Sequence, residues 1–79
     1  MNSWLVCKIG KGMFSDEVTV TVTTAAGENI AVFVPRGRVN DAQSRVSVRS
    51  FDRGDRVYVV LPDAERTAVP VKNTELTPA

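Results

Sequence analysis

The stretch from Glu17 to Thr24 reads Glu-Val-Thr-Val-Thr-Val-Thr-Thr and alternates strictly between valine and threonine. Successive side chains of a β-strand point to opposite faces of the sheet, so the valines share one face and the threonines the other. Both residue types are β-branched, which favours a strand. The chain therefore contains a half-buried antiparallel strand whose apolar row is Val18, Val20 and Val22.

A turn and a second apolar stretch follow this segment. Gly27-Glu28-Asn29 is typical of a turn, and Ile30 to Val34 again places alternate aliphatic side chains on one face, so the two stretches predict a hairpin. Weaker alternation predicts further strands. These cover Trp4 to Ile9, Arg45 to Phe51 and Arg56 to Leu61, with a short last strand from Thr67 to Val71 that Pro70 limits to a sheet edge.

The end of the chain carries a resemblance to a known fold. Ala68-Val-Pro-Val-Lys-Asn-Thr-Glu-Leu76 resembles the end of SH3 domains, where a strand runs through a Val-Pro step into a 3₁₀ turn. With short strands separated by turns, it predicts that residues 1–79 form one all-β domain, a five-stranded SH3-like antiparallel barrel with a 3₁₀ turn over Lys72 to Leu76. An OB-like barrel is the alternative. Such a barrel usually carries a helix between its third and fourth strands, and the stretch from Arg36 to Ser44 is too polar for one.

The cysteine and histidine content limits the chemistry. The chain has one cysteine, Cys7, and no histidine, so it lacks both a Cys/His metal set and the commonest general base. We therefore expect no metal, no cofactor and no enzymatic activity. A lone cysteine indicates a reducing compartment, hence the cytoplasm, and no apolar run approaches the ~20 residues that span a bilayer.

The small size of the domain leaves room for self-association. A core of this size rarely gives more than about 3–5 kcal/mol of net stability. Small domains are often stabilised further by disulfides or structural zinc, but a chain with one cysteine and no histidine can form neither. Dimerisation is the reinforcement that the sequence leaves open.

Arginine is concentrated in the middle of the chain. Residues 36–56 hold six arginines and three aspartates, whereas the net charge of the whole chain is +1. Arginine matches phosphate geometry and stacks on bases, so this segment is a candidate for binding nucleic acid. The alternative is a solvated polar face whose arginines pair with nearby aspartates, because dedicated nucleic-acid modules usually have a higher pI.

The aromatic side chains point away from the predicted core. Alternation places Trp4 and Phe33 opposite the aliphatic rows of their strands, and exposed aromatic residues beside arginine are typical of an interface. The alternative is that loop residues such as Met13 and Phe14 fold over these rings. We expect a non-catalytic protein-interaction or assembly module, with self-association included and nucleic-acid binding through residues 36–56 as the alternative. The predicted binding residues are Trp4, Phe33, Tyr58, Arg49 and Arg56.

Overall fold

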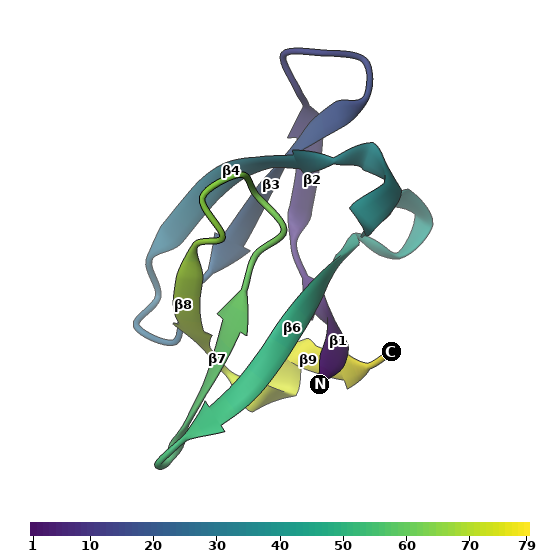
Figure 1. The fold of residues 1–79 in the computed structure, drawn as a ribbon. Helices are drawn as coiled ribbons and strands as arrows, with labels where there is room; N and C mark the ends of the chain where they lie inside the picture. The colour runs from purple at the N-terminus through teal and green to yellow at the C-terminus, as the bar shows by residue number, and fades with distance from the viewer.

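The computed structural model describes all 79 residues, and the chain forms two antiparallel β-sheets without an α-helix (Figure 1). Three short 3₁₀ turns interrupt the strands, and no helix is long and apolar enough to cross a membrane. The strands are β1 (Asn2–Val6), β2 (Lys8–Lys11), β3 (Glu17–Thr23), β4 (Asn29–Pro35), β5 (Val39–Asn40), β6 (Arg45–Arg53), β7 (Arg56–Val60), β8 (Ala68–Val71) and β9 (Leu76–Pro78). The 3₁₀ turns are η1 (Arg36–Arg38), η2 (Asp41–Gln43) and η3 (Asn73–Glu75).

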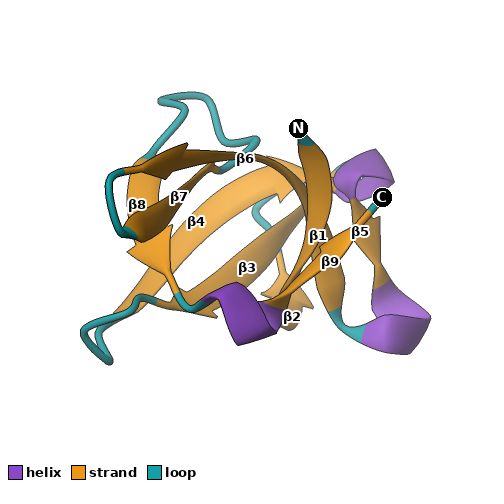
Figure 2. Ribbon diagram, turned by 90° about the horizontal axis from the view of Figure 1, so that it is seen from below, coloured by secondary structure: helices purple, strands orange, loops and turns teal.

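The larger sheet, sheet A, has the strand order β8-β7-β6-β1-β9, with the short β5 paired to β6. The smaller sheet, sheet B, is the meander β2-β3-β4. Seen from below, β3 and β4 lie across from β6 and β7, so the two sheets enclose the core between them (Figure 2). The prediction of an all-β fold is confirmed. The hydrogen-bonded strands form two sheets rather than one closed barrel.

The core is made of small aliphatic side chains, and the alternating patterns predict those that lie in β3, β4 and β6 and around β1. Val20, Val46, Val59 and Leu61 are fully buried, and the valines on either side of Val20 in β3 are at most 2% exposed. The β3–β4 register opposes Val20 to Val32 and Val22 to Ile30, so valine packs on β-branched neighbours. The complete core is Leu5, Cys7, Val18, Val20, Val22, Val34, Val46, Val48, Val59, Leu61, Val69 and Val71.

The stretch predicted as one strand from Trp4 to Ile9 belongs to both sheets. β1 pairs with β6 and β9 in sheet A, whereas β2 pairs with β3 in sheet B. The ladder breaks at Cys7, whose N–H donates to the carbonyl of Ser44 at 3.0 Å. The alternation of burial continues through this bend, because Leu5 and Cys7 both face the core. A local pattern cannot show that the hydrogen-bonding partner changes along an otherwise regular strand.

The C-terminal segment has the predicted turn and an additional strand. The 3₁₀ turn η3 lies within the expected range, and β8 is an edge strand of sheet A that contains Pro70. The carbonyl of Pro70 accepts a hydrogen bond from Ala25 N–H at 2.9 Å, which ties β8 to the β3–β4 turn. β9 then pairs with β1, and its three residues are too few to show a period.

Candidate functional site

The outer surface of sheet A gathers arginine and aromatic side chains from three strands. Opposed residues in an antiparallel ladder point to the same face, so the registers between β1, β6 and β7 identify the outward positions. The core-facing set contains Leu5, Val46, Val48 and Val59, and the alternate residues face outward. We call the following outward set the basic aromatic face: Trp4, Arg45, Arg49, Phe51, Arg53, Arg56 and Tyr58.

The arginines of this face are placed by the alternation of β6. Arg45, Arg49 and Arg53 recur every four residues and therefore share one side of the strand. Arg56 on β7 lies directly opposite Arg53 across the hairpin. Like charges opposed in this way destabilise a sheet. The two guanidinium groups therefore place like charges at the end of this hairpin.

The aromatic rings of the face lie among these arginines. Phe51 and Tyr58 are opposed in the β6–β7 register and stack with ring centroids 5.7 Å apart and an interplanar angle of 16°. Trp4 is opposed to Ser47, so Arg45 and Arg49 are its diagonal neighbours. None of the five aromatic residues of the chain belongs to the aliphatic core. The domain therefore folds mainly around valine and leucine, and its aromatic rings lie outside that core.

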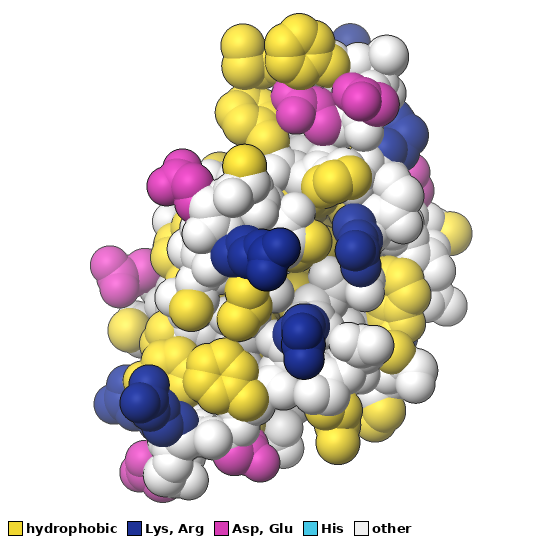
Figure 3. All heavy atoms as spheres, viewed as in Figure 1, with side chains coloured by type: hydrophobic (Ala, Val, Ile, Leu, Met, Phe, Trp, Pro, Cys, Tyr) yellow, Lys and Arg dark blue, Asp and Glu magenta, His cyan; other side chains and the backbone are white.

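The seven residues of the basic aromatic face include no carboxylate, and acidic side chains lie at its margins. Only two of the nine acidic residues, Glu17 and Asp52, lie in strands. Asp52 alternates with Phe51 and Arg53 along β6 and therefore points to the opposite side of the sheet. Figure 3 views the molecule from the side of β6 and β7 and shows Lys and Arg side chains spread over this surface with Asp and Glu at its margins. Among the arginines, Arg36 alone donates a side-chain hydrogen bond within the protein, from its Nε to the carbonyl of Ser15 at 3.1 Å. The guanidinium groups of the face have no such partner.

Four of the five residues predicted to bind a partner share this face. The β1–β6 and β6–β7 pairings place four of them on the same side of sheet A: Trp4, Arg49, Arg56 and Tyr58. Phe33 does not join them, because it lies on the outer side of β4 in sheet B, 46% exposed. The face also contains residues that the site prediction missed. These residues are Arg45, Phe51 and Arg53, which lie on the same side of β6 as Arg49 because they are an even number of residues away from it. Extending the alternation from Arg49 along the strand would have predicted them.

The loop between β2 and β3 does not cover the aromatic rings. Met13 and Phe14 are 73% and 68% exposed, so they are not packed over Trp4 as the alternative interpretation required. Glu17 holds this loop through its Oε1, which accepts a hydrogen bond from Met13 N–H at 3.1 Å. Trp4 itself is half-buried in β1.

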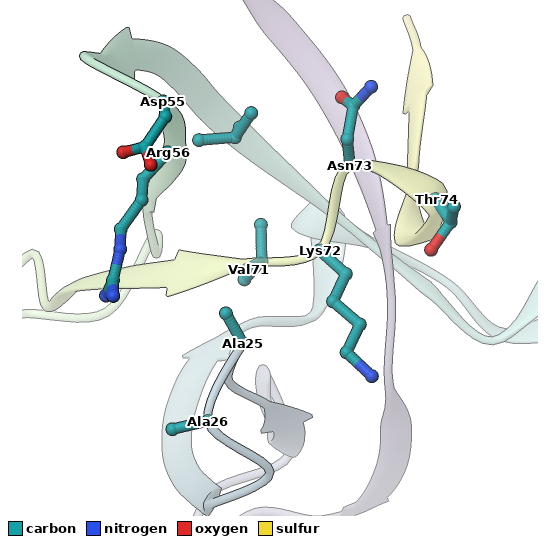
Figure 4. Close-up of a pocket in the computed structure, with 9 residues that line it drawn as sticks. Ala25, Ala26, Asp55, Arg56, Val71, Lys72, Asn73 and Thr74 are labelled. Atoms are coloured by element: carbon teal, nitrogen blue, oxygen red, sulfur yellow. The ribbon is translucent and has the colours of Figure 1, made fainter.

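A shallow cleft of about 500 Å³ lies next to one end of the face (Figure 4). Asp55 and Arg56 at the β6–β7 turn line one side of the cleft, the segment from Val71 to Thr74 crosses it, and Ala25 and Ala26 lie on the other side of Val71. Arg56 belongs to both the cleft and the basic aromatic face. The cleft contains the guanidinium of Arg56, the ammonium group of Lys72 and the carboxylate of Asp55, so it extends the basic surface past the beginning of β7.

Cys7 lies in the core and has the environment of an inert thiol. It is 6% exposed, and burial together with the charge of Asp41 raises the pKa of its thiol from 9.0 to about 11. A reactive thiol needs exposure and nearby positive charge, and Cys7 has neither. The structure contains no group of three or more His, Cys, Asp or Glu side chains that could hold a metal ion.

Comparison of the chain with protein-family models, with curated proteins and with solved structures finds no match.

Proposed function

We propose that this protein binds single-stranded nucleic acid on the basic aromatic face of sheet A. The observation that carries this proposal is the composition of the outward positions of β1, β6 and β7. They hold four arginines and three aromatic rings and contain no carboxylate. Single strands are bound by a positive surface that follows the phosphates and by aromatic rings on which the bases stack.

The arrangement of the face favours a single strand over a duplex. Stacking on Trp4, Phe51 or Tyr58 requires bases that are not already paired and stacked within a helix. Arg45, Arg49 and Arg53 follow one direction along β6 and supply a row of cations for consecutive phosphates. The net charge of +1 is compatible with this function because the acidic residues lie elsewhere, mostly in turns.

Fluorescence anisotropy of a fluorescein-labelled single-stranded oligonucleotide of mixed sequence tests this proposal. We expect binding that weakens as salt is raised, because phosphate contacts release counterions. Arg49→Glu should lower the affinity at least about tenfold and reduce the salt dependence. Phe51→Ala should also weaken binding, by about 1–3 kcal/mol for one lost stacking platform.

Arg38→Glu is the matched control, since Arg38 is exposed in η1 and changes the net charge equally. Because η1 is outside the face, this variant should bind almost as well as the wild type. Equal weakening by both charge reversals would refute the assignment of the site to sheet A. Affinity that does not respond to salt, or the absence of binding at low salt, would refute nucleic-acid binding itself.

A protein-interaction or assembly module is the second candidate function. It is favoured by apolar exposure on sheet B, where Phe33 lies outside the basic aromatic face. This function does not compete with the first for the same surface. It is compatible with a cytoplasmic protein, which the single unpaired cysteine favours.

We also interpret the fold as SH3-like. Support comes from the order β8-β7-β6-β1-β9, in which three consecutive strands form a meander. The strand that follows η3 then returns to pair with the N-terminal strand. In this interpretation the β2–β3–β4 meander is an insertion between the first two strands of the SH3-like unit.

A further inference from the structure

We infer that two copies of this chain pair through their β4 strands, in antiparallel register centred on Val32, and so join two sheets B into one continuous sheet. This inference is independent of nucleic-acid binding, and it deepens the assembly role by naming its partner as a second copy of the same chain.

β4 is a terminal strand of sheet B and its outer edge has no backbone partner. Thr24 N–H donates to the carbonyl of Glu28 at 2.8 Å, and the β3–β4 register then makes the even-numbered residues of β4 the ones bonded to β3. The N–H and C=O groups of Ala31 and Phe33 therefore point away from β3. Neither residue takes part in the backbone hydrogen bonds outside the regular ladders. In the view of Figure 1 this strand runs along the upper left of the molecule.

From Ile30 to Val34 the edge lacks the features by which proteins normally prevent strand addition, and the one proline, Pro35, stands at the end of the strand. Native edges are protected by lysine, by proline, by bulges or by short length. β4 has seven residues, and the five between Asn29 and Pro35 are all apolar. Ile30 and Val32 face the core yet remain half-buried, whereas the corresponding valines of β3 are buried, so the core is incompletely covered at this edge. A further strand would complete it.

The sequence of β4 is complementary to itself in the proposed register. With Val32 on the two-fold axis, Phe33 is opposed to Ala31 of the second copy, and the converse pair follows by symmetry. A large ring then lies over a small side chain on the outer face, while Ile30 is opposed to Val34 on the core side. Ala31 and Phe33 have free N–H and C=O groups, and this register pairs those groups across the axis. No charged residue is brought opposite its own copy.

Sedimentation velocity over a dilution series tests the inference, with a dimer expected at twice the 8.6 kDa mass of the chain. Phe33→Lys places a cation on the edge and should give a monomer. Val6→Lys is the matched control, because Val6 is 47% exposed and Phe33 is 46% exposed, and it should remain dimeric. A wild-type monomer at all concentrations, or a dimer that persists in Phe33→Lys, would overturn the proposal.

The register is tested by disulfide formation. Val32→Cys should form an intermolecular disulfide under mild oxidation, because the two introduced thiols meet at the axis in a non-hydrogen-bonded pair about 4.5 Å apart between Cα atoms. Ala31→Cys should crosslink much less, and the native Cys7 is buried and does not interfere. Crosslinking that favours position 31 would refute the register. Oligonucleotide binding by monomeric Phe33→Lys would show that the proposed function stands apart from dimerisation.

Discussion

Replacing Val20 by aspartate should unfold the domain at neutral pH. Val20 has no exposed surface and lies in the centre of sheet B, opposed to Ile9 on β2 and to Val32 on β4. Loss of a fully buried aliphatic side chain costs about 1.5–3 kcal/mol. A carboxyl forced to stay neutral at pH 7 costs about 4 kcal/mol more, since its pKa must rise about three units from its ordinary value. The total exceeds the roughly 3–5 kcal/mol expected for a core of this size.

Thermal unfolding followed by far-UV circular dichroism measures this effect, and Thr21→Asp is the control. Thr21 is one residue further along β3 and faces outward, opposed to Lys8, so the same carboxylate there gains a cation as a neighbour. The control should keep its cooperative transition. Part of the stability of Val20→Asp should return near pH 4, where the carboxyl is neutral without cost. A Tm for Val20→Asp within about 5 °C of the wild type at pH 7 would refute the assignment of the core.

Two further predictions concern Cys7 and Gly12. The raised pKa of about 11 should make native Cys7 react with an aromatic disulfide reagent at pH 8 about a hundredfold more slowly than the same thiol in denaturant. Because the pKa of Cys7 in the folded protein exceeds 9.0, the stability that the neutral thiol contributes should be complete below pH 9 and lost as the pH rises towards 11. Rapid labelling of the native protein would contradict the burial of the sulfur. A free energy of unfolding that stays constant over this pH range would contradict it as well. Gly12→Ala should lower stability by roughly 1–3 kcal/mol in urea unfolding, since a Cβ there collides with the backbone carbonyl of Glu17, and an unchanged midpoint would show that the loop can move aside.

Most of the core could be predicted from the sequence because that part follows a local rule. Alternation of apolar and polar residues places Val18, Val20, Val22, Val46 and Val48 inside, and all five are at most 3% exposed. The position of Pro70 at a sheet edge was predictable for the same reason, since a missing N–H is a property of one residue.

The candidate site was only partly predictable because it depends on which strands pair. That Trp4 shares a face with Arg49 and Arg56 follows from the β1–β6 and β6–β7 registers, which join segments far apart in the chain. Nothing local in the residues around Phe33 indicates that its strand belongs to the other sheet. The sequence also did not predict that the N-terminal stretch changes its partner strand at Cys7. The hydrogen-bonding partner changes there, but the alternation of buried and exposed residues continues unchanged.

The N-terminal segment contributes β1 to sheet A and β2 to sheet B, and the two sheets differ in how far apart in the sequence their paired strands lie. Sheet B is built by β2, β3 and β4, which follow one another directly, so its contacts close short loops at low entropic cost. Sheet A needs β1 to meet β6 and then β9, and the pair Ser3–Pro78 joins the two ends of the chain. Pairings so distant in sequence slow folding. We therefore expect the β2–β3–β4 meander to form first during synthesis, whereas sheet A is completed only after β9 has been made and can pair with β1.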